Sequence, residues 1–374
     1  MSENTEKRKS RTNWFFFIAN VVAMLCLLMS YAAAIWPPSS IGYLSLFGLA
    51  YPFILLANIV FIFYWLLKKR RNAIFSTIII LIGISFLTDF FQISFEGKVK
   101  EDHQQLKVLT YNVRLFDLYN SKTGKKTRNK IFELLDREQA DVICFQEFYH
   151  TDRKGYFTTR DTLLKFLPTK YYHERYTHAL TGQQYFGVAL FSKYPIINKG
   201  YVPFASDANN FCIYADIKVK DDTVRVYNAH LQSIRFRPED YALVEGNKNE
   251  EELDQGSKRI ARRLKLAFVK REEQVKRVAQ SIEKCKFKVV LCGDFNDPPV
   301  SYTYNTFDKL LKDSFVEAGS GTGDTYIGNF PSFRIDYIMH SSEIEAISYN
   351  TLPDELSDHH AVTATLQWPK KKTS

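Results

Sequence analysis

Two long runs without a charged residue constrain this chain more than any other feature of its sequence. Residues 14–36 form 23 consecutive uncharged positions, and residues 41–67 form 27. A helix needs about 18 or more apolar residues to cross the hydrocarbon core of a bilayer, so both runs predict transmembrane helices. A cleaved signal peptide is the alternative for the first run, but the run is too long and a second span follows directly.

A third uncharged run covers residues 72–88 and is followed by Asp89 and two phenylalanines. It reaches the length of a span, about residues 72–91, if Asp89 lies at the membrane interface, where a carboxylate costs little. We therefore expect residues 1–95 to form a membrane anchor in contact with lipid. Its three transmembrane helices lie at about residues 14–36, 41–67 and 72–91.

Basic residues beside these runs predict how the chain is oriented. Four Lys or Arg residues precede the first run, and residues 68–71, with the sequence KKRR, separate the second from the third. The positive-inside rule places both basic segments in the cytoplasm. With three spans we expect a multi-pass membrane protein whose large domain lies on the non-cytoplasmic side. If the third run does not span, the large domain is cytoplasmic instead.

The rest of the chain alternates strand and helix patterns after a short polar linker at residues 96–105. Alternating or β-branched segments predict strands at 106–113, 141–146, 171–177, 186–192, 211–218, 223–230, 287–292, 334–340, 344–349 and 361–368. Helical periodicity predicts helices at 127–137, 160–167 and 258–284. Many strands with a few interposed helices indicate an α/β (α+β) domain over residues 106–370, built from two packed β-sheets flanked by helices.

Composition excludes several kinds of site. The five cysteines have no metal-ligand spacing, so we interpret them as small core residues that form no disulfides. The sequence contains no Walker-type loop, no serine nucleophile elbow and no zinc-binding spacing. The net charge of +9 is a mild surplus that suits an anionic substrate without requiring one.

Polar residues gather where the predicted strands begin or end. In the stretch FKVVLCGDFNDPP, residues 287–299, an apolar strand breaks at Gly293 and is followed by Asp294, Asn296 and Asp297. Each such residue by itself fits a turn, a loop or a satisfied core position. Together they supply carboxylates, amides and two histidines, which is the inventory of a metal-assisted phosphoester hydrolase. The other members of this set are Asn112, Glu147, His230, Asp336, Asp358 and His359.

These segments resemble the endonuclease/exonuclease/phosphatase superfamily, which includes pancreatic-type deoxyribonuclease, abasic-site endonucleases, neutral sphingomyelinases and inositol-polyphosphate 5-phosphatases. The matching segments occur in the family's order: TYNVR at 110–114, FQEF at 145–148, GVALFSKYP at 187–195, NAHLQS at 228–233, GDFND at 293–297, RIDYI at 334–338 and SDHHAV at 357–362. The resemblance implies a four-layer, DNase I-like sandwich and a metal-dependent hydrolase acting on phosphoric ester bonds. It does not extend to the membrane segment.

The resemblance also implies a role for each site residue. Glu147 matches the main ligand of Mg²⁺ (or Mn²⁺), with Asn112 beside it and Asp358 near the metal. Asp294 and Asn296 match the pair that orients the attacking water and holds the phosphate. His359 matches a histidine that pairs with an aspartate, here Asp336, and His230 matches a second histidine of the deoxyribonuclease and sphingomyelinase branches. Either Asp294 or the His359–Asp336 pair could be the general base.

Three hypotheses for the substrate remain open. The first and favoured one is a membrane-tethered, nuclease-like phosphodiesterase. The second is a hydrolase of lipid head groups, either a phospholipid- or sphingomyelin-type phosphodiesterase or an inositol-phosphate-type phosphatase. The third is an inactive binding module that uses the same cleft. The ten Lys or Arg residues of the helix at 258–284 could follow a nucleic-acid backbone, or form a solvated face with the glutamates between them. No protein partner is inferred.

Overall fold

Two six-stranded sheets pack face to face in the computed structural model, which describes residues 2–94, 97–120, 122–153, 155, 157–180, 183–205, 210–234, 240, 250–328 and 332–370. The first sheet contains β2 (His103–Asn112), β3 (Val142–Thr151), β4 (Tyr171–Leu180), β5 (Gln184–Ser192), β13 (Glu345–Thr351) and β14 (Val362–Pro369). The second contains β6 (Ile196–Val202), β7 (Phe211–Val219), β8 (Asp222–His230), β9 (Lys288–Asp294), β10 (Lys312–Asp313) and β12 (Asp336–His340). Their strand orders are β13-β14-β2-β3-β5-β4 and β10-β12-β9-β8-β7-β6.

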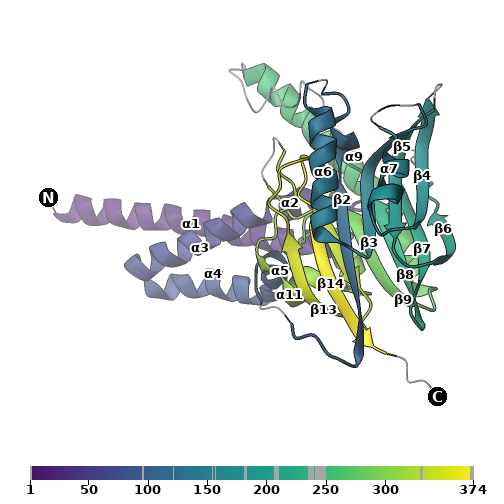
Figure 1. Cartoon of the computed structure of the whole chain (residues 1–374). Coiled ribbons are helices and arrows are strands. Elements are labelled where there is room, and N and C mark those ends of the chain that lie inside the picture. The colour runs from purple at the N-terminus through teal and green to yellow at the C-terminus, as the bar shows by residue number, and fades with distance from the viewer. Residues whose placement is uncertain are drawn as a thin grey trace.

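Helices cover the outer faces of both sheets (Figure 1). Side chains from α6 (Gly124–Glu138) and α7 (Thr159–Phe166), among them Leu135 and Leu163, pack on the first sheet. Those from α9 (Glu250–Glu283) and α10 (Tyr302–Asp308), among them Val275 and Phe307, pack on the second. A third core, with Val226 as a member, fills the space between the sheets. The four layers confirm the expected two-sheet sandwich flanked by helices.

Smaller elements complete the domain, and several were not predicted. These are β6, α10, α11 (Ser314–Ala318) and a two-stranded sheet of β1 (Gln92–Ile93) and β11 (Ser320–Gly321). The segment expected to be a linker is shorter than residues 96–105, because β2 already begins at His103. Gln104 and His103 pair there with Trp368 and Pro369 at the end of β14. The pairing of β14 with β2 therefore continues beyond the apolar part of β2.

Each sheet has one parallel pair of strands at its centre. β2 runs parallel to β3, with Asn112 beside Gln146, and β8 runs parallel to β9, with His230 beside Asp294. Parallel neighbours present their carboxyl ends at the same edge of a sheet, where ligands of α/β proteins commonly bind. The last residues of these strands therefore meet at one end of the sandwich.

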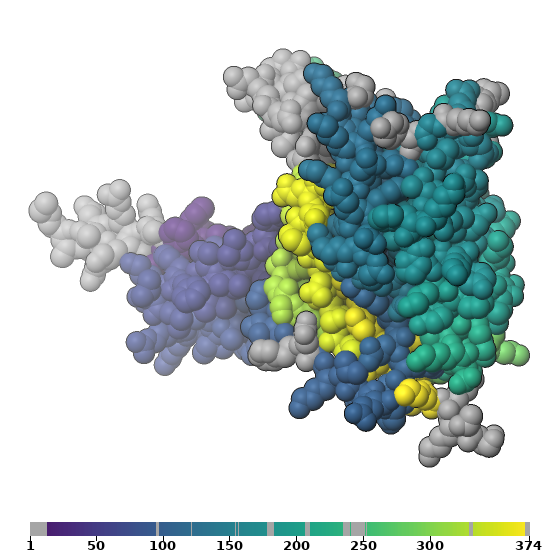
Figure 2. Space-filling view, viewed as in Figure 1, coloured from purple at the N-terminus to yellow at the C-terminus, as the bar shows by residue number. Residues whose placement is uncertain are grey.

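The N-terminal segment forms five helices: α1 (Ser2–Ile35), α2 (Ser45–Leu49), α3 (Tyr51–Lys68), α4 (Arg70–Ile82) and α5 (Ile84–Phe90). Two stretches, Asn13–Ile35 and Tyr51–Lys68, are long and apolar enough to cross a membrane. A third candidate exists if α4 and α5, which are bent by 67°, form one broken span. Figure 2 shows this segment projecting from one side of the domain.

The expected single helix over residues 41–67 is wrong, because the chain breaks at Ala50 between α2 and α3. Pro52, in the first turn of α3, has no backbone N–H and would clash with the carbonyl of residue 48 in a continuous helix. The expected helix over residues 72–91 is likewise interrupted, at Gly83. A Cβ there would lie 2.1 Å from Cζ of Tyr31, so the ring of α1 packs directly on the broken backbone.

Buried hydrogen bonds connect three of these helices. Asn20 Nδ2 in α1 donates to Ser76 Oγ in α4 at 2.7 Å, and Trp65 Nε1 in α3 donates to Asn20 Oδ1 at 2.9 Å. Hydrogen bonds between otherwise apolar helices are typical of helix bundles in membranes, where no water competes for the polar groups. They indicate that α1, α3 and α4 associate as one unit.

The N-terminal helices and the domain are joined by specific hydrogen bonds. Ser39 donates to Glu272 of α9 from its backbone N–H (2.7 Å) and from Oγ (2.9 Å). Asn305 Nδ2 in α10 donates to the carbonyl of Ala34 at 2.9 Å, and Arg334 Nη2 donates to the carbonyl of Asp89 at 2.6 Å. The C-terminal ends of α1 and α5 and the loop after α1 therefore all contact the domain.

Candidate active site

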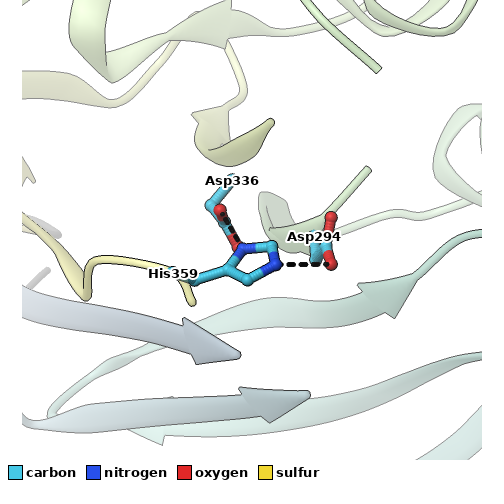
Figure 3. A group of neighbouring side chains, drawn as sticks. All are labelled: Asp294, Asp336 and His359. Atoms are coloured by element: carbon cyan, nitrogen blue, oxygen red, sulfur yellow. Dashed lines mark hydrogen bonds and ion pairs between the residues drawn. The ribbon is translucent and has the colours of Figure 1, made fainter. Parts of the chain in front are cut away.

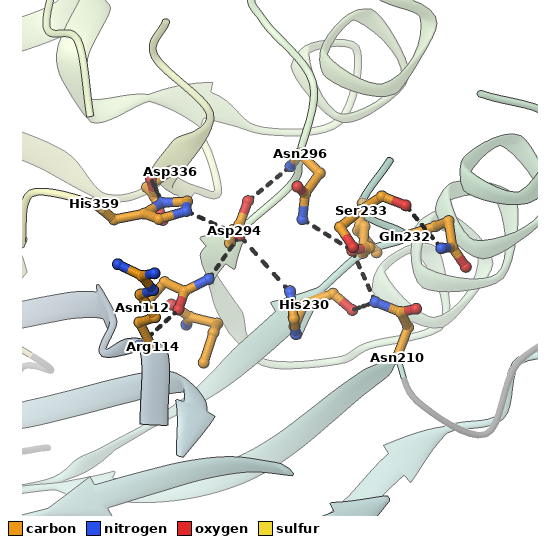
Figure 4. A network of polar contacts seen from close by, with 12 residues as sticks. Asn112, Arg114, Asn210, His230, Gln232, Ser233, Asp294, Asn296, Asp336 and His359 are labelled. Atoms are coloured by element: carbon orange, nitrogen blue, oxygen red, sulfur yellow. Dashed lines mark hydrogen bonds and ion pairs between the residues drawn. The ribbon is translucent and has the colours of Figure 1, made fainter. Parts of the chain in front are cut away.

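Asp294, the last residue of β9, lies at the centre of a polar cluster drawn from both sheets. Asn112 Nδ2, at the end of β2 in the other sheet, donates to Asp294 Oδ2 at 3.0 Å. His230 Nε2, at the end of β8, lies 3.7 Å from the same oxygen. Figure 4 shows these side chains converging on Asp294. The parallel pairing of β8 with β9 places His230 beside Asp294, and the face-to-face packing of the two sheets brings Asn112 to them.

Asp336 and His359 form a close pair beside Asp294 (Figure 3). His359 Nδ1 lies 2.8 Å from Asp336 Oδ2, and His359 Nε2 lies 3.8 Å from Asp294 Oδ2. Antiparallel pairing of β12 with β9 places Asp336 opposite Asp294. One ligand atom from each of the three residues fits within 4.8 Å, a spacing that a metal ion could use. Both ring nitrogens already face carboxylates, however, so the imidazole itself compensates their charge.

Burial and neighbouring charges shift the pKa values of this cluster. Burial alone would lower the pKa of His359, but the carboxylates of Asp336 and Asp294 raise it to about 10. Burial raises the pKa of Asp294 to about 6, although His359 beside it acts in the opposite direction. The cluster thus holds a cationic imidazole against two buried carboxylates.

The end of β9 and the turn after it each contain one residue in an unusual backbone conformation, Gly293 in the strand and Asn296 in the turn. Gly293 has φ 141°, and a Cβ there would lie 1.9 Å from the carbonyl oxygen of Ala229, so β8 passes too close for any side chain. Asn296 has φ 55°. Its backbone N–H donates to Asp294 Oδ1 at 2.8 Å, and its Nδ2 donates to the carbonyl of Leu231 at 3.0 Å. The turn therefore orients the carboxylate of Asp294.

Glu147 reaches the same cavity from β3 through a bulge. The pairing of β3 with β5 shifts between Phe145 and Phe148, and Glu147 itself has φ 49°. Burial, followed by repulsion from Asp358, raises the pKa of Glu147. The carboxylate of Glu147 is therefore destabilised as an anion, and a divalent cation between it and Asp358 would relieve both effects. Their oxygen donors fit a hard ion such as Mg²⁺ or Mn²⁺.

A cavity of about 510 Å³ contains all but one of the predicted site residues. Of the described residues, its polar lining comprises Asn112, Glu147, His230, Ser233, Asp294, Asn296, Asp358 and His359. Asp336 is fully buried behind His359. His360, the neighbour of His359, does not line this cavity, since successive side chains of an extended segment point to opposite faces.

Asp297, although it belongs to the acidic stretch after β9, serves the fold instead. Its two carboxylate oxygens accept hydrogen bonds from Nε and Nη2 of Arg271, each at 3.0 Å. Thr303 Oγ1 donates to Asp297 Oδ2 at 2.6 Å, and all three side chains are buried. This buried pair attaches the long helix α9 to the turn that carries Asn296.

Sequence reasoning missed Arg114. Its Nε lies 3.7 Å from Asp358 Oδ2 at the edge of the site, and its backbone N–H donates to Asn112 Oδ1 at 3.1 Å. Residues 114–117 have φ values of 42°, 54°, 58° and 56°, a left-handed turn that side-chain-bearing residues seldom adopt. Phe116, fully buried in this turn, packs on the aromatic core. The only signal was its place two residues after Asn112 in TYNVR.

Family comparison agrees with this geometry. The model of the Endonuclease/Exonuclease/phosphatase family matches residues 109–359. The chain belongs to this family. It is therefore a member of a family of phosphoesterase hydrolases, as the resemblance of its motifs predicted. A second model, for a domain of unknown function, matches residues 13–90. No curated protein matches the chain.

Solved structures of this family share the fold. A family protein from Leptotrichia buccalis is 18% identical, with a TM-score of 0.51 over 70% of this chain and 99% of that one. A family protein from Bacteroides thetaiotaomicron is 16% identical, with a TM-score of 0.52 over 72% and 99%. One from Beutenbergia cavernae is 17% identical, with a TM-score of 0.51 over 71% and 72%. At sequence identities this low, the similarity shows a shared fold and nothing about activity or substrate.

Proposed function

We propose that this protein is a membrane-anchored phosphodiesterase that depends on Mg²⁺ or Mn²⁺ and hydrolyses its substrate by attack of water. The observation that carries the proposal is the set of side chains around Asp294. Asn112 and His230 approach it from the two sheets, His359 pairs with Asp336 beside it, and the cavity also contains the carboxylates of Glu147 and Asp358.

Glu147 and Asp358, with Asn112 beside them, are the residues that would hold the metal. Bound there, a divalent ion would polarise a phosphoryl oxygen and neutralise the charge that develops on it. Asn296, His230 and His359 lie around the remaining space, and their N–H groups can donate to the other phosphoryl oxygens in the transition state. The site thus offers positive or hydrogen-bonding groups on several sides of an anionic ester.

The hydrolytic step needs one proton acceptor. As the water oxygen forms a bond to phosphorus, the ester P–O bond breaks and the leaving oxygen takes up a proton. We assign the acceptor role to Asp294, because both nitrogens of His359 face carboxylates and neither directs a lone pair at water. His359 then acts as a donor to the phosphate or to the leaving oxygen.

The function is tested with the purified full chain in detergent and a soluble diester, methyl 4-nitrophenyl phosphate. We expect Mg²⁺-dependent release of 4-nitrophenolate, loss of activity in EDTA and recovery on addition of Mg²⁺ or Mn²⁺. The Asp294→Asn variant should be inactive under the same conditions. Turnover that persists in EDTA would contradict the metal requirement. Binding of the diester without turnover would instead indicate an inactive binding module.

The anchor is proposed to cross the membrane three times, with the catalytic domain outside the cytoplasm. The hydrogen bonds that join Ala34, Ser39 and Asp89 to the domain support this topology, because the loop after α1 and the end of α5 then lie on the domain's side. The basic residues 68–71 lie at the other end of α3 and α4 (Figure 1). Their position fits the cytoplasmic side.

Reporter fusions test this topology. Alkaline phosphatase fused after Ser374 should be active, and green fluorescent protein at the same position should be dark. Fusions after Lys69 serve as the control and should give the reverse pattern. Fluorescence of the green fluorescent protein fused after Ser374 would show that α4 and α5 do not cross the bilayer.

A further inference from the structure

One wall of the catalytic cavity is built by the membrane anchor. Leu46 and Leu49 of α2, the break residue Ala50 and Phe53 of α3 line it together with Asp294 and the other polar site residues. Leu46, Leu49 and Ala50 lie at positions i, i+3 and i+4, the spacing of one helix face, and Phe53 follows beyond the break in the first turn of α3. Apolar residues of the domain complete this wall: Ile234, Ile260, Leu264, Phe333 and Ile335.

The anchor segment is fastened where it forms this wall. A Cβ at Gly48 would lie 2.3 Å from the carbonyl oxygen of Val300, so α2 rests directly on the backbone that follows the Asp294 turn. Lys265 Nζ lies 4.8 Å from the centre of the Tyr43 ring, and Ser39 donates twice to Glu272. These contacts on both sides of α2 hold it against α9 and the catalytic turn.

The apolar wall continues onto the outside of a membrane-spanning candidate. Phe53 lines the cavity, yet 57% of its surface is exposed, and it belongs to the first turn of the Tyr51–Lys68 span. Leu56, one turn further along α3, is 58% exposed. A chain of methylene groups that leaves the cavity along Leu49 and Phe53 therefore enters the hydrocarbon region without crossing water.

We propose that the substrate is an amphiphilic phosphoester of the membrane itself, a phospholipid-like molecule whose apolar chain lies on the wall formed by Leu46, Leu49, Ala50 and Phe53. Its phosphate group then reaches Asp294 while its chain stays at the surface of α3. This inference rests on the proposed phosphodiesterase function and adds the class of substrate.

The same observations disfavour a nucleic-acid substrate. None of the described residues that line the cavity is a Lys or Arg, whereas nucleic-acid sites follow the phosphate backbone with such residues. Basic residues of α9 are instead paired with carboxylates: Arg271 with Asp297, Lys276 with Glu272, and Arg277 with Glu273. Seven of the nine apolar wall residues named above are aliphatic, with Phe53 and Phe333 as the aromatic ones, and aliphatic side chains bind an alkyl chain better than a nucleic-acid base.

The test compares two soluble diesters with the same leaving group, methyl and hexyl 4-nitrophenyl phosphate, using the full chain in one detergent with Mg²⁺. We expect kcat/KM for the hexyl ester to be roughly 30-fold higher, the effect of removing two to three methylene groups from water. The readout for each variant is the ratio of the two values. Leu49→Gln should reduce this ratio about tenfold.

Leu266→Gln is the matched control, because Leu266 lies on α9 near Leu264 but is 57% exposed outside the cavity lining. It should keep the wild-type ratio. Gly48→Val, which pushes α2 away from Val300, provides a second variant that should lower the ratio if Leu49→Gln does not fold.

Three results would separate the possible failures. Equal rates on the methyl and hexyl esters would overturn the lipid inference and leave the phosphodiesterase function standing. No turnover of either ester would overturn the proposed function itself. A kcat/KM for a single-stranded DNA oligonucleotide above that for the hexyl ester would overturn the inference in favour of a nuclease. Release of the water-soluble phosphorylated head group from phosphatidylglycerol or phosphatidylethanolamine vesicles by the reconstituted protein would support the lipid inference.

Discussion

Glu147→Gln is expected to lower kcat by roughly 10³-fold and to weaken Mg²⁺ binding by at least about 100-fold. The substitution keeps the shape of the side chain and removes the charge that the ion requires. The measurements are the Mg²⁺ dependence of kcat on methyl 4-nitrophenyl phosphate and calorimetric titration of the full chain with Mg²⁺. An unchanged titration midpoint would remove Glu147 from the metal site.

Thermal unfolding gives a second readout of the same variant. Burial and Asp358 raise the pKa of Glu147, so its ionised form disfavours the metal-free fold at neutral pH. In EDTA, Glu147→Gln should therefore unfold at the same temperature as the wild type or higher. In excess Mg²⁺ the order should reverse, because only the wild type gains stability from the bound ion.

Glu138→Gln is a matched control for Glu147→Gln. Glu138 is also partly buried, but it pairs with Lys107 midway along β2, five residues before Asn112. Its replacement should leave both the Mg²⁺ titration and kcat within about twofold. If Glu138→Gln reduced Mg²⁺ affinity as much as Glu147→Gln, general loss of acidic charge would explain the effect.

The polar cluster could be predicted from the sequence because most of its residues lie at the ends of regular strands. Asn112, His230 and Asp294 each end a strand whose apolar alternation is visible, and parallel neighbours bring such ends together. The strand patterns also predicted the two packed sheets. Short edge strands such as β6 escaped prediction, since its residues are mostly exposed and carry little periodic signal.

Features that depend on contacts between distant segments were not visible in the sequence. Leu46 and Leu49 belong to an uncharged run, and hydropathy cannot distinguish a residue facing lipid from one facing a catalytic cavity. Pro52 was the local signal for a break, but Pro at the start of a helix is common. The left-handed turn at Arg114 has no glycine to mark it, because the burial of Phe116 holds it in place.

His359→Ala is expected to reduce kcat by roughly 10²–10⁴-fold, the range for a group that transfers or shares a proton in the transition state. It should also destabilise the fold by about 3–5 kcal/mol, because it leaves a buried charge without its partner. Asp336 is fully buried and its Oδ2 faces His359. Among the described residues, its Oδ1 has no hydrogen-bond partner, so the imidazole is the main compensation for this carboxylate.

A double-mutant cycle with Asp336→Asn separates activity from stability in this pair. An aspartate that acts by orienting the imidazole has no further effect once the ring is gone, so the double variant should be no less active than His359→Ala alone. The double variant should also be more stable than His359→Ala, because the unpaired charge is removed. His360→Ala, whose ring lies outside the cavity lining, is the control and should keep near-wild-type kcat. Fully additive losses of activity in the double variant would contradict the proposal that His359 and Asp336 act together. A larger loss from His360→Ala than from His359→Ala would contradict the assignment of His359 to the site.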